Sequence, residues 1–126
     1  MTDDGVRILV VEDEYLIADY LQDLLAEFGY EDVHIAGNLD QGYELLRTIV
    51  PDFAILDVNV GDRLVFPLAT EIAACGIPLV FSTARSLDEF PPEWRNRELI
   101  PKPLEPERLR LILKNRESCR GGGLPD

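Results

Sequence analysis

The sequence predicts an α/β fold in which one parallel sheet is covered by helices on both faces. Short apolar, β-branched runs alternate five times with stretches whose apolar residues recur at helical spacing, which is typical of parallel strands joined by right-handed crossovers. The run at 53–58 is apolar except for Asp57 and is bounded by Pro51 and Gly61, as expected of a central strand covered on both faces. A flavodoxin-like, doubly wound sheet with the strand order 2-1-3-4-5 fits these elements best.

The first half of the chain supplies two strand–helix units. A strand is predicted at 6–11, and the helix that follows it ends at Gly29, a residue common just past a helix C-terminus. A second strand is predicted at 33–36, and Asn38 is a good N-cap for a helix that Pro51 terminates. The apolar stripe expected to pack the first helix on the sheet consists of Ile17, Tyr20, Leu21, Leu24, Leu25 and Phe28.

The second half continues the alternation with one irregular unit. A helix is predicted to begin at Phe66-Pro67, with proline in the tolerated first turn, and a fourth strand covers 79–82. Between 86 and 98, Pro91-Pro92 breaks any long helix, so the fourth helix should be short or irregular, with at most one or two turns. A brief strand at 99–100 and a last helix from near Pro106 complete the fold.

The length of 126 residues allows one domain, predicted at 1–116, and the glycine-containing tail at 117–126 is predicted to be disordered. The net charge of −12 disfavours nucleic acid and anionic membranes as partners, because phosphate groups would be repelled. The acidic excess lies entirely in residues 1–84, which favours the last third as a docking face, although a solvated surface of mixed charge explains the same distribution. No apolar run reaches membrane-spanning length, and the N-terminal residues Met-Thr-Asp-Asp-Gly lack the basic region of a signal peptide, so we expect a cytoplasmic protein.

Three carboxylates are predicted to meet at one edge of the sheet. Glu12 and Asp13 follow the first strand and Asp57 follows the third, and these strands are neighbours in the proposed order. Carboxylates in one crevice repel one another unless a cation or a raised pKa relieves them. Mg²⁺ suits two carboxylates plus a backbone carbonyl, such as that of Asn59. The sequence therefore predicts a magnesium site here.

Two further groups reach the same edge. Thr83 ends the fourth strand and Lys102 follows the fifth, adding a hydroxyl and an ammonium group to the metal and carboxylates. These are the parts needed to transfer a phosphoryl group to a carboxylate, a reaction that depends mostly on positioning and charge neutralisation.

In these motifs the chain resembles a response-regulator receiver domain from residue 6 to about 114. It is most similar to the single-domain subgroup with a Phe-x-Thr-Gly-Tyr-like motif. The matching stretches are Ile8 to Glu14, Ile55 to Gly61, Phe66-Pro67, Gly76-Ile77-Pro78, Phe81-Ser82-Thr83 and Lys102-Pro103.

The resemblance implies a role for each site residue. Asp57 would accept a phosphoryl group from a histidine kinase or a histidine phosphotransfer protein. Asp13 and the Asn59 carbonyl would bind Mg²⁺ directly, while Glu12 would orient a water on the metal. Thr83 and Lys102 would hold phosphoryl oxygens, and the Lys102–Pro103 peptide would be cis.

The same resemblance sets the expected role of the whole protein. It would be a stand-alone receiver in bacterial two-component or phosphorelay signalling, without an output domain, and would act through another protein. It would not be a dedicated enzyme, although autodephosphorylation is compatible with the site. The partner's identity and a homodimeric state stay open.

The chain departs from the subgroup at two positions. Ala84-Arg85 replaces Gly-Tyr, and Leu99 stands where many receivers carry an aromatic residue, so the usual aromatic switch is missing. Burying an unpaired guanidinium costs several kcal/mol, so Arg85 should stay outside and pair with a phosphoryl oxygen or with Asp62, Asp88 or Glu89. Contact with the phosphoryl group would order the segment 86–98.

The sequence also suggests a docking surface and two alternative functions. Tyr15 and Ala18 fall off the core stripe and would offer an apolar patch to a phosphohistidine-bearing helix. One alternative is a pseudo-receiver that binds partners without phosphorylation. The other is an aspartate-nucleophile phosphohydrolase, but its second acid would have to stand at Asn59, which cannot donate a proton.

Overall fold

The computed structural model describes residues 5–121, with side chains as far as residue 115. Its centre is a five-stranded parallel sheet in the order β2-β1-β3-β6-β7. A small hairpin takes the labels β4 and β5, so this order is the predicted 2-1-3-4-5, and the predicted fold class is confirmed. The strands of the main sheet are β1 (Arg7–Val11), β2 (Asp32–Ala36), β3 (Phe53–Leu56), β6 (Leu79–Thr83) and β7 (Leu99–Pro101).

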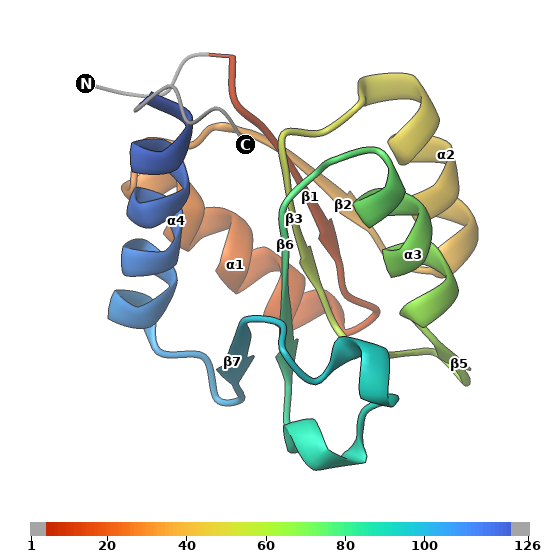
Figure 1. Cartoon of the computed structure of the whole chain (residues 1–126). Helices are drawn as coiled ribbons and strands as arrows, with labels where there is room; N and C mark the ends of the chain where they lie inside the picture. Colours follow the sequence, from red (N-terminus) through yellow and green to blue (C-terminus); the bar gives the residue numbers. More distant parts are fainter. Residues whose placement is uncertain (1–4, 122–126) are drawn as a thin grey trace.

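Helices cover both faces of the sheet. α1 (Tyr15–Glu27) and α4 (Pro106–Gly121) lie on one face, and α2 (Leu39–Ile49) and α3 (Phe66–Ala74) lie on the other (Figure 1). Successive side chains of a strand point to opposite faces, so β1 sends Ile8 and Val10 into the α1–α4 layer and Leu9 and Val11 into the α2–α3 layer. Two apolar clusters result, and both hold the central strands in place.

The helix boundaries follow the local signals. The Asn38 side chain accepts a hydrogen bond of 2.8 Å from the Gln41 amide, which caps α2 as predicted. Gly76, after α3, has a φ of 78°, a left-handed conformation that glycine adopts without strain. α4 begins at Pro106, as predicted. It continues to Gly121, so residues 117–121 of the predicted disordered tail are helical, in keeping with the good helix formers Lys114, Arg116 and Glu117. The rest of that tail, 122–126, lies outside the described residues.

The face of α1 that packs on the sheet differs from the predicted stripe. Ala18 is 5% exposed and belongs to the core, together with Leu21, Leu24 and Leu25, whereas Tyr20 is 46% exposed. The prediction that Ala18 offers a surface patch is therefore wrong. Helical periodicity alone predicts that the larger tyrosine is buried and not the alanine. A small side chain, however, is well suited to a close contact between a helix and a sheet. Tyrosine can lie at the flank and keep its hydroxyl in water.

The segments that follow β3 and β6 lie at the same end of the molecule. Residues predicted to form a loop after Asp57 make an antiparallel hairpin of β4 (Asn59–Val60) and β5 (Arg63–Leu64), with Gly61 at φ 67° in its turn. The irregular segment after β6 contains only the short 3-10 turns η1 (Leu87–Glu89) and η2 (Pro92–Trp94), as predicted.

An aromatic cluster holds this irregular segment. Phe90 is 2% and Trp94 5% exposed. Phe90 lies edge-on to Phe66 of α3 and Phe81 of β6, with ring centroids 5.4 and 5.3 Å apart, and Trp94 contacts the same two rings. Burial of two large aromatic side chains thus compensates for the missing helix.

Within the described part of the chain, no helix has the length and apolar character needed to cross a membrane.

Candidate functional site

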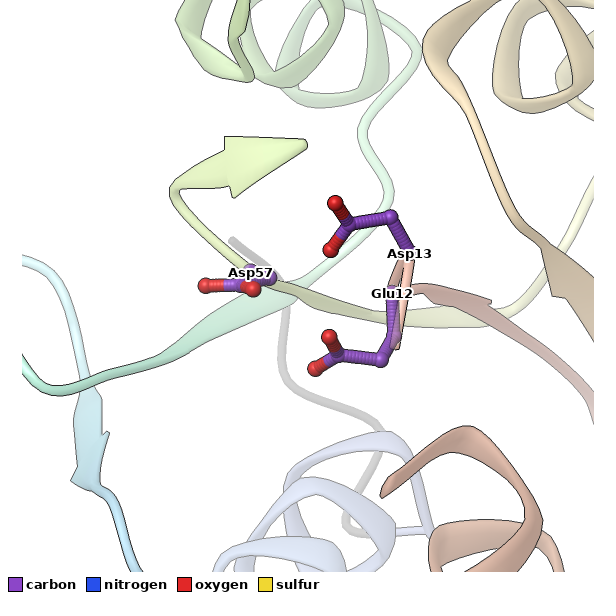
Figure 2. Close-up of side chains that lie close together, drawn as sticks. All are labelled: Glu12, Asp13 and Asp57. Carbon is purple, nitrogen blue, oxygen red and sulfur yellow. The ribbon is translucent and has the colours of Figure 1, made fainter. Parts of the chain in front are cut away.

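Three carboxylates from two neighbouring strands form the centre of the site. Glu12 and Asp13 follow β1, and Asp57 follows β3, whose residue Leu56 pairs with Val11 of β1. One carboxylate oxygen of each residue lies within 4.8 Å of the others, and Figure 2 shows the three side chains grouped at this edge. The convergence that the strand order predicted is therefore present in the structure.

Glu12 is the buried member of this group, with 3% of its surface exposed. Burial raises its pKa above the ordinary value of a glutamic acid, and the charge of Asp57 acts in the same direction, while the Lys102 hydrogen bond opposes both. Its two oxygens already have partners. Oε1 accepts from the Lys102 ammonium and Oε2 from the Glu14 amide. Glu12 is therefore placed to support the site from behind.

Lys102 joins Glu12 and Asp57. Its Nζ lies 3.0 Å from Glu12 Oε1 and 3.2 Å from Asp57 Oδ2. Burial lowers the pKa of Lys102, but the hydrogen bonds and charges of Glu12 and Asp57 outweigh it and raise the pKa above its ordinary value. The ammonium group is therefore charged at neutral pH. The peptide bond from Lys102 to Pro103 is cis, as expected.

Asp13 is exposed and is tied to the β4–β5 hairpin. Its Oδ2 accepts a hydrogen bond of 2.8 Å from the Gly61 amide. Pairs in an antiparallel ladder alternate between hydrogen-bonded and non-hydrogen-bonded. Since the Val65 amide donates to the Val58 carbonyl, the next pair, Asn59 with Leu64, is non-hydrogen-bonded. The hairpin ladder therefore leaves the Asn59 carbonyl unused.

Thr83 lies at the end of β6, beside Lys102. The Lys102 amide donates to the Thr83 carbonyl at 3.1 Å, and the Thr83 side chain is buried. Its hydroxyl oxygen accepts from the Arg85 amide at 3.2 Å. Ser82, the preceding residue, points to the opposite face of the sheet and lines a cavity there.

Arg85 stays at the surface and pairs with Glu89, one of the three acids predicted for it. The distance from Nη1 to Glu89 Oε1 is 3.5 Å. Its shortest contact was not predicted: Nε donates to the Asn59 side-chain oxygen at 2.7 Å. The segment 86–98, predicted to become ordered through Arg85, already has a defined structure held by Phe90 and Trp94.

A cavity of about 360 Å³ adjoins the site on the α1 side. It lies between α1 and the turn that leads from β7 into α4. Its walls are mostly apolar and are formed by Leu16, Ile17, Tyr20, Ser82, Lys102, Pro103 and Leu104. Tyr15 and Leu16, on the outer face of α1, are 77% and 76% exposed. Of the predicted docking pair, Tyr15 is on the surface and Ala18 is not.

Two residues at the site, Gly61 and Leu16, were not predicted from the sequence. The Gly61 amide binds Asp13 from 48 positions away, and a glycine in a polar loop gives no sign of such a contact. Leu16 was also missed. An apolar residue off the core stripe of a helix is a weak signal, since single exposed apolar residues are normal.

Comparisons with known proteins agree with this geometry. The family model of the response regulator receiver domain matches residues 8–114. The transcriptional regulatory protein DltR of Streptococcus agalactiae is 34% identical over 125 residues, covering 90% of this chain and 53% of that protein. The transcriptional regulatory protein PdtaR of Mycobacterium tuberculosis is 42% identical over 81 residues, covering 64% of this chain and 40% of the relative. The chain thus spans about half the length or less of these curated relatives.

Solved structures give the same result. The solution structure of SdrG from Sphingomonas melonis is 32% identical, with a TM-score of 0.75, and the match covers 89% of this chain and 96% of SdrG. The N-terminal domain of an uncharacterized protein from Wolinella succinogenes has a TM-score of 0.82 at 24% identity, over 95% of this chain and all of that one, and it shows the shared fold. This chain therefore belongs to the response regulator receiver domains, which are modules of two-component signalling and not dedicated enzymes.

Proposed function

We propose that the protein accepts a phosphoryl group on Asp57 from a phosphohistidine donor and relays a signal through protein–protein contacts. The observation that carries this proposal is the cluster of Glu12, Asp13 and Asp57, in which one ammonium group, that of Lys102, binds two of the three acids. Lys102 contacts both Glu12 and Asp57, but Asp57 is less buried than Glu12. Asp57 therefore has a cation beside it and remains accessible to a phosphodonor.

The donor set fits Mg²⁺. Three carboxylates face one ammonium group, and the resulting negative charge favours a hard divalent cation, which prefers oxygen ligands. Asp13, Asp57 and the unused Asn59 carbonyl would hold the metal, while Glu12, with both oxygens occupied, would support the site from behind. The bound metal would neutralise charge on the transferring phosphoryl group.

The side chains of the site carry out the remaining steps of phosphoryl transfer. A carboxylate oxygen of Asp57 attacks phosphorus, a new O–P bond forms, and the P–N bond to the donor imidazole breaks. The electron pair returns to the imidazole nitrogen, which takes up a proton from solvent. Lys102 and the Thr83 hydroxyl hold the phosphoryl oxygens, and Lys102 is kept in position by Glu12.

The two alternative functions lack support in the site. A pseudo-receiver would be expected to lack at least one of the acceptor, the acids or the lysine, and here Asp57 and Lys102 lie 3.2 Å apart. For a phosphohydrolase, the side chain of Asn59 would have to act as a general acid, yet its oxygen accepts a hydrogen bond from Arg85.

A small phosphodonor tests the acceptor assignment. The wild-type protein should gain the mass of one phosphoryl group when the donor and Mg²⁺ are both present, and should gain nothing with EDTA. Asp57→Asn should remain unlabelled. Asp62→Asn, a matched change at an exposed aspartate in the hairpin turn, should be labelled like the wild type. A phosphoryl group on the Asp57→Asn protein would reject the proposal.

We further infer that the phosphodonor docks on the outer face of α1. Tyr15 and Leu16 form an exposed apolar patch beside the cavity, and Lys102 lines that cavity while also binding Asp57. A helix that presents a phosphohistidine could pack its apolar side here and bring the phosphoryl group to Asp57.

We propose that this phosphoryl transfer takes place in the cytoplasm, where the exposed free thiol of Cys75 would stay reduced.

The docking inference has its own test. Tyr15→Asp should slow transfer from a phosphorylated kinase or phosphotransfer protein and leave labelling by the small donor unchanged. Val50→Asp is the matched control, because Val50 is 55% exposed and lies before β3, at the opposite edge of the sheet. If Tyr15→Asp slows both donors equally, the patch has no docking role.

A further inference from the structure

Arg85 contacts two residues of the candidate site, Thr83 and Asn59. Its amide donates to the Thr83 hydroxyl oxygen at 3.2 Å. At the other end of the residue, Nε donates to the Asn59 side chain at 2.7 Å, two positions after Asp57 in the chain. Both ends of Arg85 therefore lie against neighbours of the proposed phosphoryl acceptor.

The same guanidinium also holds the start of the irregular segment. Its Nη1 lies 3.5 Å from Glu89, the last residue of η1. The amides of Glu89 and Phe90 donate to the carbonyls of Ser86 and Leu87, both at 3.0 Å. Further along, the Phe90 ring is buried, whereas the Glu89 side chain is exposed and pairs with Arg85.

The pairing with Glu89 is weak enough to be exchanged. The two side chains are 45% and 55% exposed, and exposed ion pairs contribute little to stability. The other partner, Asn59, is uncharged. A phosphoryl group carries about two negative charges at neutral pH and offers several acceptor oxygens, so it is a stronger ligand for a guanidinium than either present partner.

We propose that Arg85 is a phosphoryl-binding residue that exchanges Glu89 for the phosphoryl group on Asp57 and thereby releases η1. Lys102 approaches Asp57 together with Glu12, from the buried side. Arg85 lies at the exposed surface, where it binds the Asn59 side chain, two positions after Asp57. The phosphoryl group would lie between the two cations. This inference rests on the proposed acceptor function. It assigns to the release of η1 the conformational change that a downstream partner recognises.

Amide hydrogen exchange of the whole chain tests the exchange of partners. The protein is measured with MgCl₂, with and without beryllium fluoride as a mimic of the phosphoryl group. In the wild type, the Glu89 and Phe90 amides should exchange roughly two- to fivefold faster when the mimic is bound, the factor that corresponds to loss of one exposed ion pair. Glu89→Gln should show this faster exchange already without the mimic and no further increase with it.

Affinity for the mimic gives a second readout. Arg85→Gln should bind beryllium fluoride about tenfold more weakly than the wild type, because a hydrogen bond to a charged group is lost. Arg63→Gln is the matched control. Arg63 is exposed on the hairpin and pairs with Asp40, so this variant should bind and exchange like the wild type.

The outcomes separate the two proposals. Binding of the mimic without a change at Glu89 and Phe90, or unchanged affinity in Arg85→Gln, would overturn the role of Arg85 and leave the acceptor function standing. A wild-type protein that takes up neither beryllium fluoride nor a phosphoryl group would overturn both.

Discussion

Replacing Lys102 by methionine should lower the stability of the metal-free protein and tighten its binding of Mg²⁺. The methionine keeps most of the apolar stem and removes the ammonium group, which lies 3.0 Å from Glu12 and 3.2 Å from Asp57. Three carboxylates with oxygens within 4.8 Å of one another would then lack the ammonium group that binds two of them. The two effects have opposite signs, and together they are diagnostic of a charge-compensated metal site.

The size of the stability loss follows from burial. Removing one partner of a fully buried ion pair costs about 3–5 kcal/mol. The side chain of Glu12 is 2% exposed, but those of Asp57 and Lys102 are 11% and 19% exposed, so water screens part of the interaction. We therefore expect a loss of about 2–3 kcal/mol in the free energy of unfolding at neutral pH with EDTA.

The expected gain in metal affinity has the same electrostatic origin. Two unit charges 4 Å apart interact by about 4 kcal/mol at an effective dielectric constant of about 20. Relief of even a third of such a repulsion between Lys102 and the metal changes the dissociation constant about tenfold. Millimolar Mg²⁺ should therefore recover part of the stability that Lys102→Met loses, by mass action.

Urea denaturation of the wild type and Lys102→Met, each with EDTA and with MgCl₂, measures both effects. Lys114→Met serves as control, since Lys114 is exposed on α4, away from the acids, and it should match the wild type throughout. If Lys102→Met were as stable as the wild type in EDTA, or bound Mg²⁺ more weakly, the account of the site as mutually repelling acids held by Lys102 would be wrong.

Three further predictions concern the scaffold, and urea denaturation measures each. Phe81→Ala should cost about 3–5 kcal/mol, because the ring is fully buried and contacts Phe90; a loss below about 1 kcal/mol would show that the aromatic cluster does not hold the irregular segment. Asn38→Ala should cost about 1 kcal/mol through loss of the cap on the Gln41 amide, and an unchanged midpoint would contradict that role. Gly76→Ala should cost about 1 kcal/mol because of its φ of 78°; since a Cβ there meets no atom within 4 Å, a gain in stability would refute the argument from backbone strain.

Local signals in the sequence were sufficient for the fold and for the acids of the site. Apolar runs of strand length, the cap at Asn38 and the glycine at position 76 act over a few residues, so their consequences can be read without knowing what lies opposite. The strand order then follows from a few packing rules, and it brings Glu12, Asp13 and Asp57 to one edge because parallel strands share a direction.

Only the tertiary structure decided which side chains meet across the site. The Gly61 amide reaches Asp13 because a hairpin forms where the sequence suggested a loop, and two short strands have too few residues to show a period. Arg85 binds Asn59 because two segments 26 positions apart in the chain lie next to each other. On α1, the packing of the helix against its neighbours buries Ala18 and leaves Tyr20 half-exposed. Sequence periodicity predicts which side of a helix is apolar, whereas the packing of neighbouring elements decides which residues of that side become buried.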